Sequence, residues 1–125
     1  MVRLFKNKWF ARFASAENID DATLCKAIAD AEKGLIDADL GGGVIKQRIA
    51  RAGEGASGGF RSIVLYRQGK LAFFVFGFPK NRTANIKKDE LRAFTKLAKE
   101  MLALDDRQIA RLTKTKALIE VIRHG

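Results

Sequence analysis

The chain has 125 residues, 47% of them hydrophobic, and a formal net charge of +10 at pH 7. A chain of this length buries one hydrophobic core, so we expect a single domain over residues 1–125. No apolar run reaches the roughly 20 residues that span a bilayer, and the N-terminus lacks the uninterrupted apolar segment of a signal peptide. The sequence therefore predicts a cytoplasmic protein without a membrane partner. Its charge indicates a nucleic-acid or acidic-protein partner.

The N-terminal part predicts a short strand followed by a helix. Residues 2–5 are long enough for a short strand, and the helix is expected over residues 9–16. Three aromatic residues recur there at helical spacing and are expected to form a core face. They are Trp9, Phe10 and Phe13.

A second helix is expected to begin after Asp20 or Asp21, because a carboxylate there can accept a hydrogen bond from the first helical turn. Gly34 supplies the stop signal. The apolar positions of this helix keep helical spacing and are Leu24, Ile28, Ala31 and Leu35. Together the two helices form a helical pair ahead of a sheet.

Three strand-like runs follow, and cations are spaced along them. In the first run, residues 44–51, alternation places Lys46 and Arg48 on one face and Ile45 and Ile49 on the other. From Gly41 to Lys88 the chain carries ten Lys or Arg and one acid. A sheet face of this kind suits phosphate groups.

The second and third runs predict a hairpin. Residues 60–67 are rich in β-branched and aromatic side chains, and residues 68–70 turn the chain into residues 71–78. The third run is apolar on both faces, so we expect it to be central or covered by a helix. It ends at Pro79, which cannot donate to a ladder.

Two further helices are expected after the hairpin. The first carries an amphipathic stripe between Leu91 and Leu102. The second, weaker one includes the apolar positions Ile109, Leu112, Ile119 and Ile122. The predicted class is therefore α+β, with an N-terminal helix pair packed on a small twisted antiparallel sheet and with C-terminal helices.

Familiar catalytic sets and cofactor motifs are missing from the sequence. The lone histidine, His124, and the lone cysteine, Cys25, exclude metal clusters and paired nucleophile systems, so we expect no metal and no cofactor. Residues 53–58 match a dinucleotide-binding spacing formally, but they lead into a strand instead of a helix. The remaining candidates for catalysis are the lysine and arginine side chains, and RNA strand scission is a reaction that such side chains can catalyse. In that reaction a 2′-hydroxyl attacks the adjacent phosphate, a lysine among cations serves as base, and arginines hold the developing charge.

Two motifs carry a resemblance to a known family. They are Ser57-Gly58-Gly59-Phe60-Arg61 before the hairpin and Phe78-Pro79-Lys80-Asn81-Arg82 after it. With the two preceding helices, they make the chain resemble the RelE/ParE superfamily of bacterial toxins, in particular its RelE/HigB-like branch. The resemblance implies a microbial ribonuclease-like fold, cleavage of messenger RNA in the ribosomal A site, and neutralisation by a small DNA-binding antitoxin encoded next door.

The resemblance also assigns roles to individual residues. The expected catalytic cations are Lys46, Arg48, Arg61, Lys80 and Arg82. The expected RNA-binding residues are Arg51, Tyr66 and Phe78. Messenger-RNA cleavers of the family often have a tyrosine after the last pair of cations, and residues 83–86 contain none. Tyr66 or Phe78 can replace it only if the sheet face allows.

Three alternatives stay open at this level. The superfamily also contains toxins that bind DNA gyrase, and a plain RNA-binding module without chemistry would carry similar charge. Arg61 has a second interpretation as a structural ion pair. Arg67 and Lys70 are interpreted as solvated charges at the tip of the hairpin.

Overall fold

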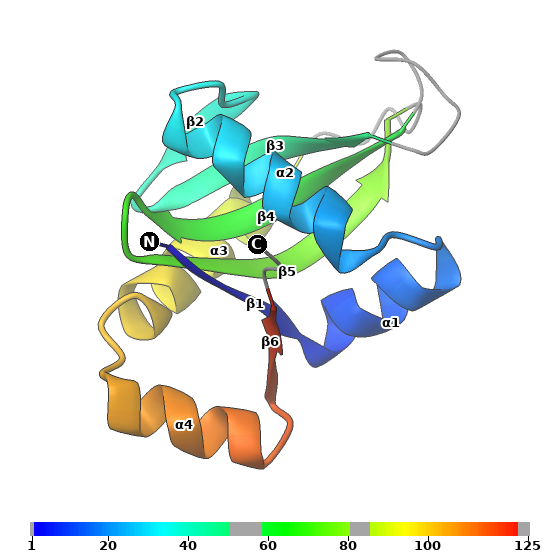
Figure 1. Cartoon of the computed structure of the whole chain (residues 1–125). Helices are drawn as coiled ribbons and strands as arrows, with labels where there is room; N and C mark the ends of the chain where they lie inside the picture. Colours follow the sequence, from blue (N-terminus) through cyan, green and yellow to red (C-terminus); the bar gives the residue numbers. More distant parts are fainter. Residues whose placement is uncertain (1, 51–58, 81–85, 123–125) are drawn as a thin grey trace.

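The computed structural model describes residues 2–50, 59–80 and 86–122, and these form an α+β fold around a six-stranded mixed sheet (Figure 1). In chain order the elements are β1 (Arg3–Asn7), α1 (Lys8–Ala16), α2 (Asp21–Glu32), β2 (Ala38–Gly41), β3 (Val44–Ala50), β4 (Gly59–Arg67), β5 (Leu71–Pro79), α3 (Lys88–Met101), α4 (Asp106–Lys114) and β6 (Leu118–Val121). Across the sheet the strand order is β2-β3-β4-β5-β1-β6.

The three strand-like runs form β3, β4 and β5, and the predicted hairpin joins β4 to β5 through Arg67 opposite Leu71. The apolar run β5 lies between β4 and β1, so its predicted central position is confirmed. The expectation of an antiparallel sheet is wrong for one pairing, because β1 runs parallel to β5. Helices α1 and α2 and three strands separate β1 from β5 in the chain, and this long connection permits a parallel pairing.

Helices α1 and α2 pack on one face of the sheet and share one core cluster with it. Their caps follow from the sequence. The Asn7 side chain accepts a hydrogen bond from Phe10 N at 2.8 Å, and Asp20 accepts one from Thr23 N at 2.9 Å. The Thr23 hydroxyl also donates to Asp20, and these bonds lower the pKa of the Asp20 carboxyl. The helix-capping prediction at Asp20 is confirmed.

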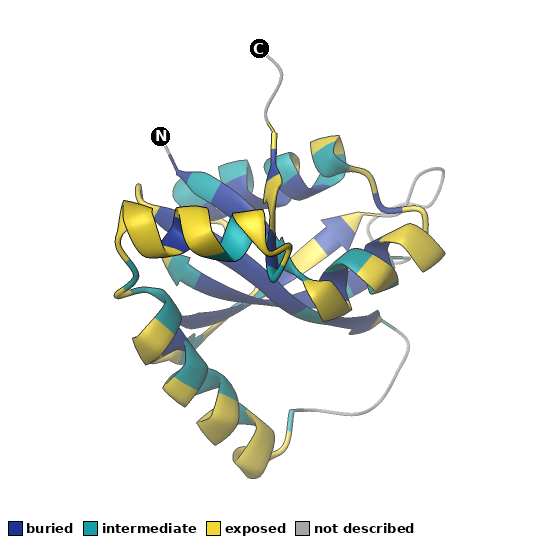
Figure 2. Ribbon diagram, turned by 90° about the horizontal axis from the view of Figure 1, so that it is seen from below, coloured by how far each residue is buried: buried dark blue, intermediate teal, exposed yellow. Residues whose placement is uncertain are grey.

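Helices α3 and α4 cover the opposite face (Figure 1). Their buried anchors are Ala98 and Ile109, which join a cluster containing the strand residues Val44, Ile63 and Phe73. Figure 2 shows the result: the strands are mostly buried, and exposed residues follow the outer sides of the helices. The sheet is therefore a middle layer with a separate hydrophobic cluster on each side.

Several apolar residues do not occupy the places that periodicity predicted. Trp9 is 41% exposed at the start of α1 and does not belong to the buried core face. Leu35 lies after the end of α2 and is 63% exposed. Ile119 belongs to β6, and Ile122 follows that strand at 64% exposure. The predicted last helix is therefore wrong after residue 114, because four residues complete the sheet as an edge strand instead.

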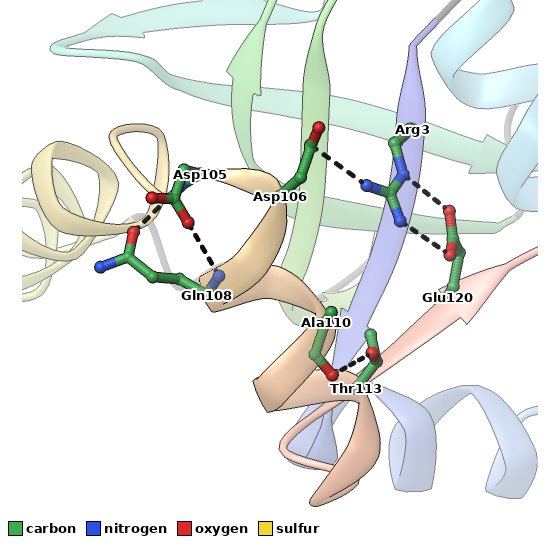
Figure 3. Close-up of polar contacts among 7 residues, drawn as sticks. All are labelled: Arg3, Asp105, Asp106, Gln108, Ala110, Thr113 and Glu120. Carbon is green, nitrogen blue, oxygen red and sulfur yellow. Dashed lines mark hydrogen bonds and ion pairs between the residues drawn. The ribbon is translucent and has the colours of Figure 1, made fainter.

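Arg3 fastens the C-terminal elements to the first strand (Figure 3). Its Nε and terminal nitrogen bind the two carboxylate oxygens of Glu120 at 3.0 and 3.1 Å, which joins β1 to β6. The other terminal nitrogen lies 3.6 Å from Asp106 in the first turn of α4. Asp105 and Gln108 close a capping box at the same helix start. These contacts hold α4 beside the edge strand.

Candidate functional site

Strand register brings three of the expected catalytic cations to one face of the sheet. Arg48 on β3 stands opposite Arg61 on β4, and Lys46 stands two residues along β3 from Arg48. Alternate residues of a strand share a face, so all three lie on the side that α3 and α4 cover. Phe78 on β5 is the cross-strand neighbour of Arg61 and belongs to the hydrophobic cluster on the α3–α4 side of the sheet. The cationic face thus contains an apolar residue beside its central arginine.

Asp37 holds two of these cations together. Its Oδ2 lies 3.1 Å from Arg61 Nε and 3.8 Å from Lys46 Nζ. The Arg61 side chain is only 14% exposed. One of its terminal nitrogens, NH1, is buried and has no hydrogen-bond partner within the described residues. One edge of the guanidinium is therefore fixed by a carboxylate, while another donor retains its hydrogen-bonding capacity.

Gln47 positions the segment that carries Asp37. This residue lies between Lys46 and Arg48 and is only 3% exposed. Its amide nitrogen donates to the carbonyls of Ala27 and Leu35 at 2.8 and 2.9 Å, and its oxygen accepts from Asp37 N at 3.1 Å. The glutamine thereby fastens the α2–β2 connection to β3 and sets the place of the carboxylate.

The sequence did not identify Asp37 or Gln47 as site residues. Gln47 carried a usable signal, because a polar residue between Ile45 and Ile49 on the apolar face of a strand needs buried partners. Asp37 carried none, since it is one of seven acids between Ser15 and Leu40. Its pairing depends on β2 returning beside β3, a strand that the sequence pattern did not reveal.

The remaining expected cations lie near or beyond the edge of what is described. Lys80 is half-buried directly after β5, and its backbone N–H donates to the Gly59 carbonyl at 3.0 Å. This bond places it at the end of the sheet from which β4 begins, the Arg61 end. Arg51 and Arg82 lie outside the described residues.

Tyr66 does not share the cationic face. It packs against the α1–α2 cluster, and its hydroxyl donates to the Glu32 carboxylate at the end of α2. The same carboxylate accepts from Gly69 N at 3.0 Å, so it also braces the β4–β5 turn. This position fits a structural bond between helix and hairpin, and it leaves Phe78 as the aromatic neighbour of Arg61.

The titration of Tyr66 tests this placement. Burial, and then the hydrogen bond to Glu32, raise the pKa of the Tyr66 hydroxyl above its ordinary value. The neutral phenol therefore stabilises the fold below pH 10 or so, and that contribution is lost as the pH rises through the raised pKa. Because Tyr66 is the only tyrosine, absorbance at the tyrosinate band reports it alone.

In the folded protein we expect this absorbance to rise only at a pH above that of free tyrosine. Glu32→Gln removes the negative charge beside the hydroxyl and should move the transition partly back, because the effect of burial remains. Ionisation at the free-tyrosine pH in the native protein would contradict the Tyr66–Glu32 bond.

The cluster of Lys46, Arg48 and Arg61 is suited to binding and stabilising negative charge. Asp37 offsets part of its charge and leaves the three cations with a net positive excess. A guanidinium in a partly desolvated site donates strong hydrogen bonds to phosphate oxygens, and neighbouring cations strengthen the effect. Among the described residues, no group of three or more His, Cys, Asp or Glu is arranged to hold a metal ion.

None of the helices that the structure describes is long and apolar enough to cross a membrane.

Comparison with known proteins identifies the family. A comparison with curated proteins found no match. A family model described as the RelE toxin of the RelE/RelB toxin–antitoxin system matches residues 2–121, nearly the whole chain. The chain therefore belongs to the RelE family of toxins, whose partners are antitoxins.

Proposed function

We propose that this toxin inhibits translation as a ribosome-dependent messenger-RNA endonuclease of the RelE/HigB-like branch. The observation that carries the proposal is the convergence of Lys46, Arg48 and Arg61 on one sheet face beside Phe78. Lys46 and Arg61 are partly buried and held by Asp37, and cations fixed in this way are preorganised for phosphate, whereas scattered surface cations are not. The antitoxin is proposed to be a small DNA-binding protein encoded next door.

In the proposed reaction the ribosome presents the messenger RNA, and the chain's own side chains act on the phosphate. The 2′-oxygen of one nucleotide forms a bond to the adjacent phosphorus, and the bond from phosphorus to the 5′-oxygen of the next nucleotide breaks. The 2′-proton passes to a base and the leaving oxygen gains a proton, so the products are a 2′,3′-cyclic phosphate and a 5′-hydroxyl. Arg61 binds the phosphate oxygens as negative charge accumulates on them, and Lys46 and Arg48 add to that stabilisation.

Asp37 has a positioning role in this proposal. Its bond to Nε fixes one edge of the guanidinium, and NH1 is buried without a hydrogen-bond partner in the described residues. The structural and functional interpretations of Arg61 are therefore compatible, because the pair with Asp37 uses one edge of the guanidinium and leaves its other N–H groups for the proposed phosphate contacts. Lys80 and Arg82 are proposed to complete the phosphate contacts from the segment after β5.

Expression of the chain without an antitoxin should arrest bacterial growth by stopping protein synthesis. A toxin that cuts messenger RNA on ribosomes acts on every active ribosome, so pulse labelling of new protein should fall before DNA synthesis does. Full-length messenger RNA should decline at the same time. Induction of the DNA-damage response with intact messenger RNA would favour the gyrase-binding alternative, and normal growth with well-folded protein present would contradict both.

The affinity of the purified toxin for single-stranded RNA should fall steeply with salt. Each phosphate that a cation neutralises releases counterion, with a logarithmic slope of about −0.7 per contact on single strands. If Lys46, Arg48, Arg61, Lys80 and Arg82 all engage, the slope is on the order of −3. Fluorescence anisotropy of a labelled RNA across a salt series measures it.

A matched pair of variants locates those contacts. Arg48→Ala removes an exposed cation of the cluster and should reduce the slope by about 0.7. Arg67→Ala removes an exposed cation from the far end of β4 and should leave the slope unchanged. Equal slopes for the wild type and Arg48→Ala would remove Arg48 from the proposed interface.

A further inference from the structure

Trp9 at the start of α1 is the most exposed aromatic side chain among the residues that the structure describes. Its indole stacks on two phenylalanines. The ring centroids lie 5.4 Å from that of Phe13 in the same helix and 4.5 Å from that of Phe76 on β5. Both phenylalanines are half-buried, so part of this group reaches the surface. We call Trp9, Phe13 and Phe76 the aromatic platform.

The aromatic platform forms because β1 leaves the sheet before β5 ends. β1 pairs with β5 only as far as Phe74, and it leads directly into α1 (Figure 1). Phe76 therefore lies beyond the paired part of β5, where Trp9 stacks on it. Gly77 permits the close approach of the helix, since a Cβ atom there would lie 2.5 Å from Phe13 Cε2. The sequence thus brings three aromatic rings together at this edge of the sheet.

Strand β5 connects the aromatic platform to the cationic cluster. The rings of Phe76 and Phe78 have centroids 6.2 Å apart, and Phe78 is the cross-strand neighbour of Arg61. Phe78 is itself buried, and Tyr66 packs on the opposite face of the sheet, so neither presents a ring to a ligand bound at Arg61. The aromatic platform offers an exposed ring along β5 instead.

The exposed surface of α1 next to the aromatic platform is cationic. Lys8 and Arg12 are exposed, stand one helical turn apart and precede Trp9 and Phe13 directly in the chain. Within the described part of the chain, neither cation pairs with a carboxylate. The first turn of α1 contains no acid. Proteins that bind single strands combine these two features, with cations along the phosphates and aromatic surfaces against the bases.

We propose that the aromatic platform stacks a base of the bound messenger RNA, with Trp9 as the main contact and with Lys8 and Arg12 near the adjoining phosphates. Trp9 is a positioning residue in this proposal, because it holds the strand while the cations around Arg61 act on the phosphate. The identity of the RNA rests on the proposed function. Stacking tolerates every base, since each has a π face, so the aromatic platform positions the strand without selecting a codon.

A membrane surface is the other partner that a cationic helix with an exposed tryptophan could suit, and the observations favour RNA. Apart from Trp9, the large apolar side chains of α1 are turned toward the core, because Phe10 is buried and Phe13 half-buried. Membrane binding scales with the apolar area that a helix inserts, and one partly covered indole supplies little. Stacking of a base needs only one aromatic surface.

Trp9 is the only tryptophan, so its fluorescence reports on the aromatic platform directly. The probe is a single-stranded RNA with 2′-O-methyl groups throughout, which lacks the attacking hydroxyl and stays intact. At saturation it should quench the emission, because a base stacked on an indole quenches it. A probe of equal length built from abasic nucleotides keeps its phosphates and should leave the emission unchanged. Equal responses to the two probes, or saturated binding without quenching, would overturn the proposal.

A matched pair of variants separates stacking from packing. Trp9→Phe keeps an aromatic ring and should retain most of the affinity for the 2′-O-methyl probe, measured by fluorescence anisotropy of a labelled RNA. Trp9→Leu keeps apolar cover over Phe76 but has no ring, so it should bind on the order of 10-fold more weakly, as expected for the loss of one stacked base. Equal affinities of the two variants would give Trp9 a packing role alone and contradict the proposal.

Ile122→Ala is the control for loss of an exposed apolar side chain. Ile122 follows β6, beyond the end of β1 that is opposite to α1, and the change should leave the affinity for the probe unaltered. A loss as large as that of Trp9→Leu would show a general surface effect and overturn the proposal. A blue shift of Trp9 emission with phosphatidylserine vesicles, without any response to RNA, would make α1 a membrane surface and have the same consequence.

The proposed function and the aromatic platform can fail separately. The 2′-O-methyl probe cannot be cut, so its binding does not depend on catalysis. Quenching that requires bases, in a toxin that cuts no messenger RNA, would refute the proposed function and leave the base-stacking surface standing. Cleavage by Trp9→Leu at the rate of the wild type, together with equal responses to the two probes, would refute the aromatic platform and leave the proposed function standing.

Discussion

Replacing Arg61 with alanine should abolish growth arrest and reduce messenger-RNA cleavage by roughly 10²- to 10³-fold, the loss that follows removal of one preorganised donor to a developing negative charge. The side chain is largely buried, fixed by Asp37, and retains a buried donor without a partner in the described structure. Cleavage rates of ribosome-bound messenger RNA by the purified toxin, together with colony counts after induction, measure the effect.

Two further variants separate chemistry from folding. Arg61→Lys keeps the charge but loses the forked donor geometry, so it should recover little activity. Arg67→Ala removes an arginine from the other end of the same strand and should retain toxicity. The single tryptophan, Trp9, stacks on Phe76 with ring centroids 4.5 Å apart, so its emission reports native packing. An unfolded Arg61→Ala protein, or a fully toxic one, would give Arg61 a purely structural role.

Replacing Asp37 with alanine should lower both stability and activity. Arg61 would lose its carboxylate partner while remaining mostly buried, and leaving such a donor unpaired costs about 2 kcal/mol in the free energy of unfolding. The backbone bond from Asp37 N to Gln47 is retained in this variant, so the α2–β2 connection keeps its attachment to β3. Urea unfolding and the cleavage assay measure the two effects.

Asp37→Asn and Asp30→Asn make this test specific. Asparagine at position 37 still accepts a hydrogen bond from Arg61 and should give an intermediate loss. Asp30 pairs with Lys26 on the surface of α2 at 3.2 Å, and its neutralisation should change stability by no more than about 0.5 kcal/mol. If Asp37→Ala is as stable and as active as Asp30→Asn, then Asp37 does not position Arg61.

Sequence periodicity predicted the elements whose residues face a single core. Helix α2 was predictable because Asp20 caps it and its apolar residues recur with helical spacing, and β4 and β5 because β-branched and aromatic residues surround a glycine turn. The edge strands β2 and β6 have four residues each, too few for a clear period. The parallel pairing of β1 with β5 joins distant parts of the chain and leaves no local pattern.

The candidate site could be predicted from the sequence only where strand geometry alone determines it. Alternation along β3 placed Lys46 and Arg48 together, and the register with β4 brings Arg61 opposite Arg48. The pairing of Asp37 with Arg61 depends on a tertiary return of β2, which no spacing encodes. The resemblance implies an RNA-binding role for Tyr66, but alternation along β4 directs this side chain to the opposite face, where its hydroxyl donates to the Glu32 carboxylate.

The most direct test of the central claim is 5′-end mapping of a defined messenger RNA incubated with the purified toxin, with and without ribosomes stalled at a known codon. We expect new 5′ ends within the A-site codon only when ribosomes are present, and none with Arg61→Ala. Each new end should carry a 5′-hydroxyl, as the proposed attack by the 2′-oxygen requires. Ribosome-independent cutting, or the same cleavage by Arg61→Ala, would contradict the account, as would intact messenger RNA on ribosomes treated with the wild type.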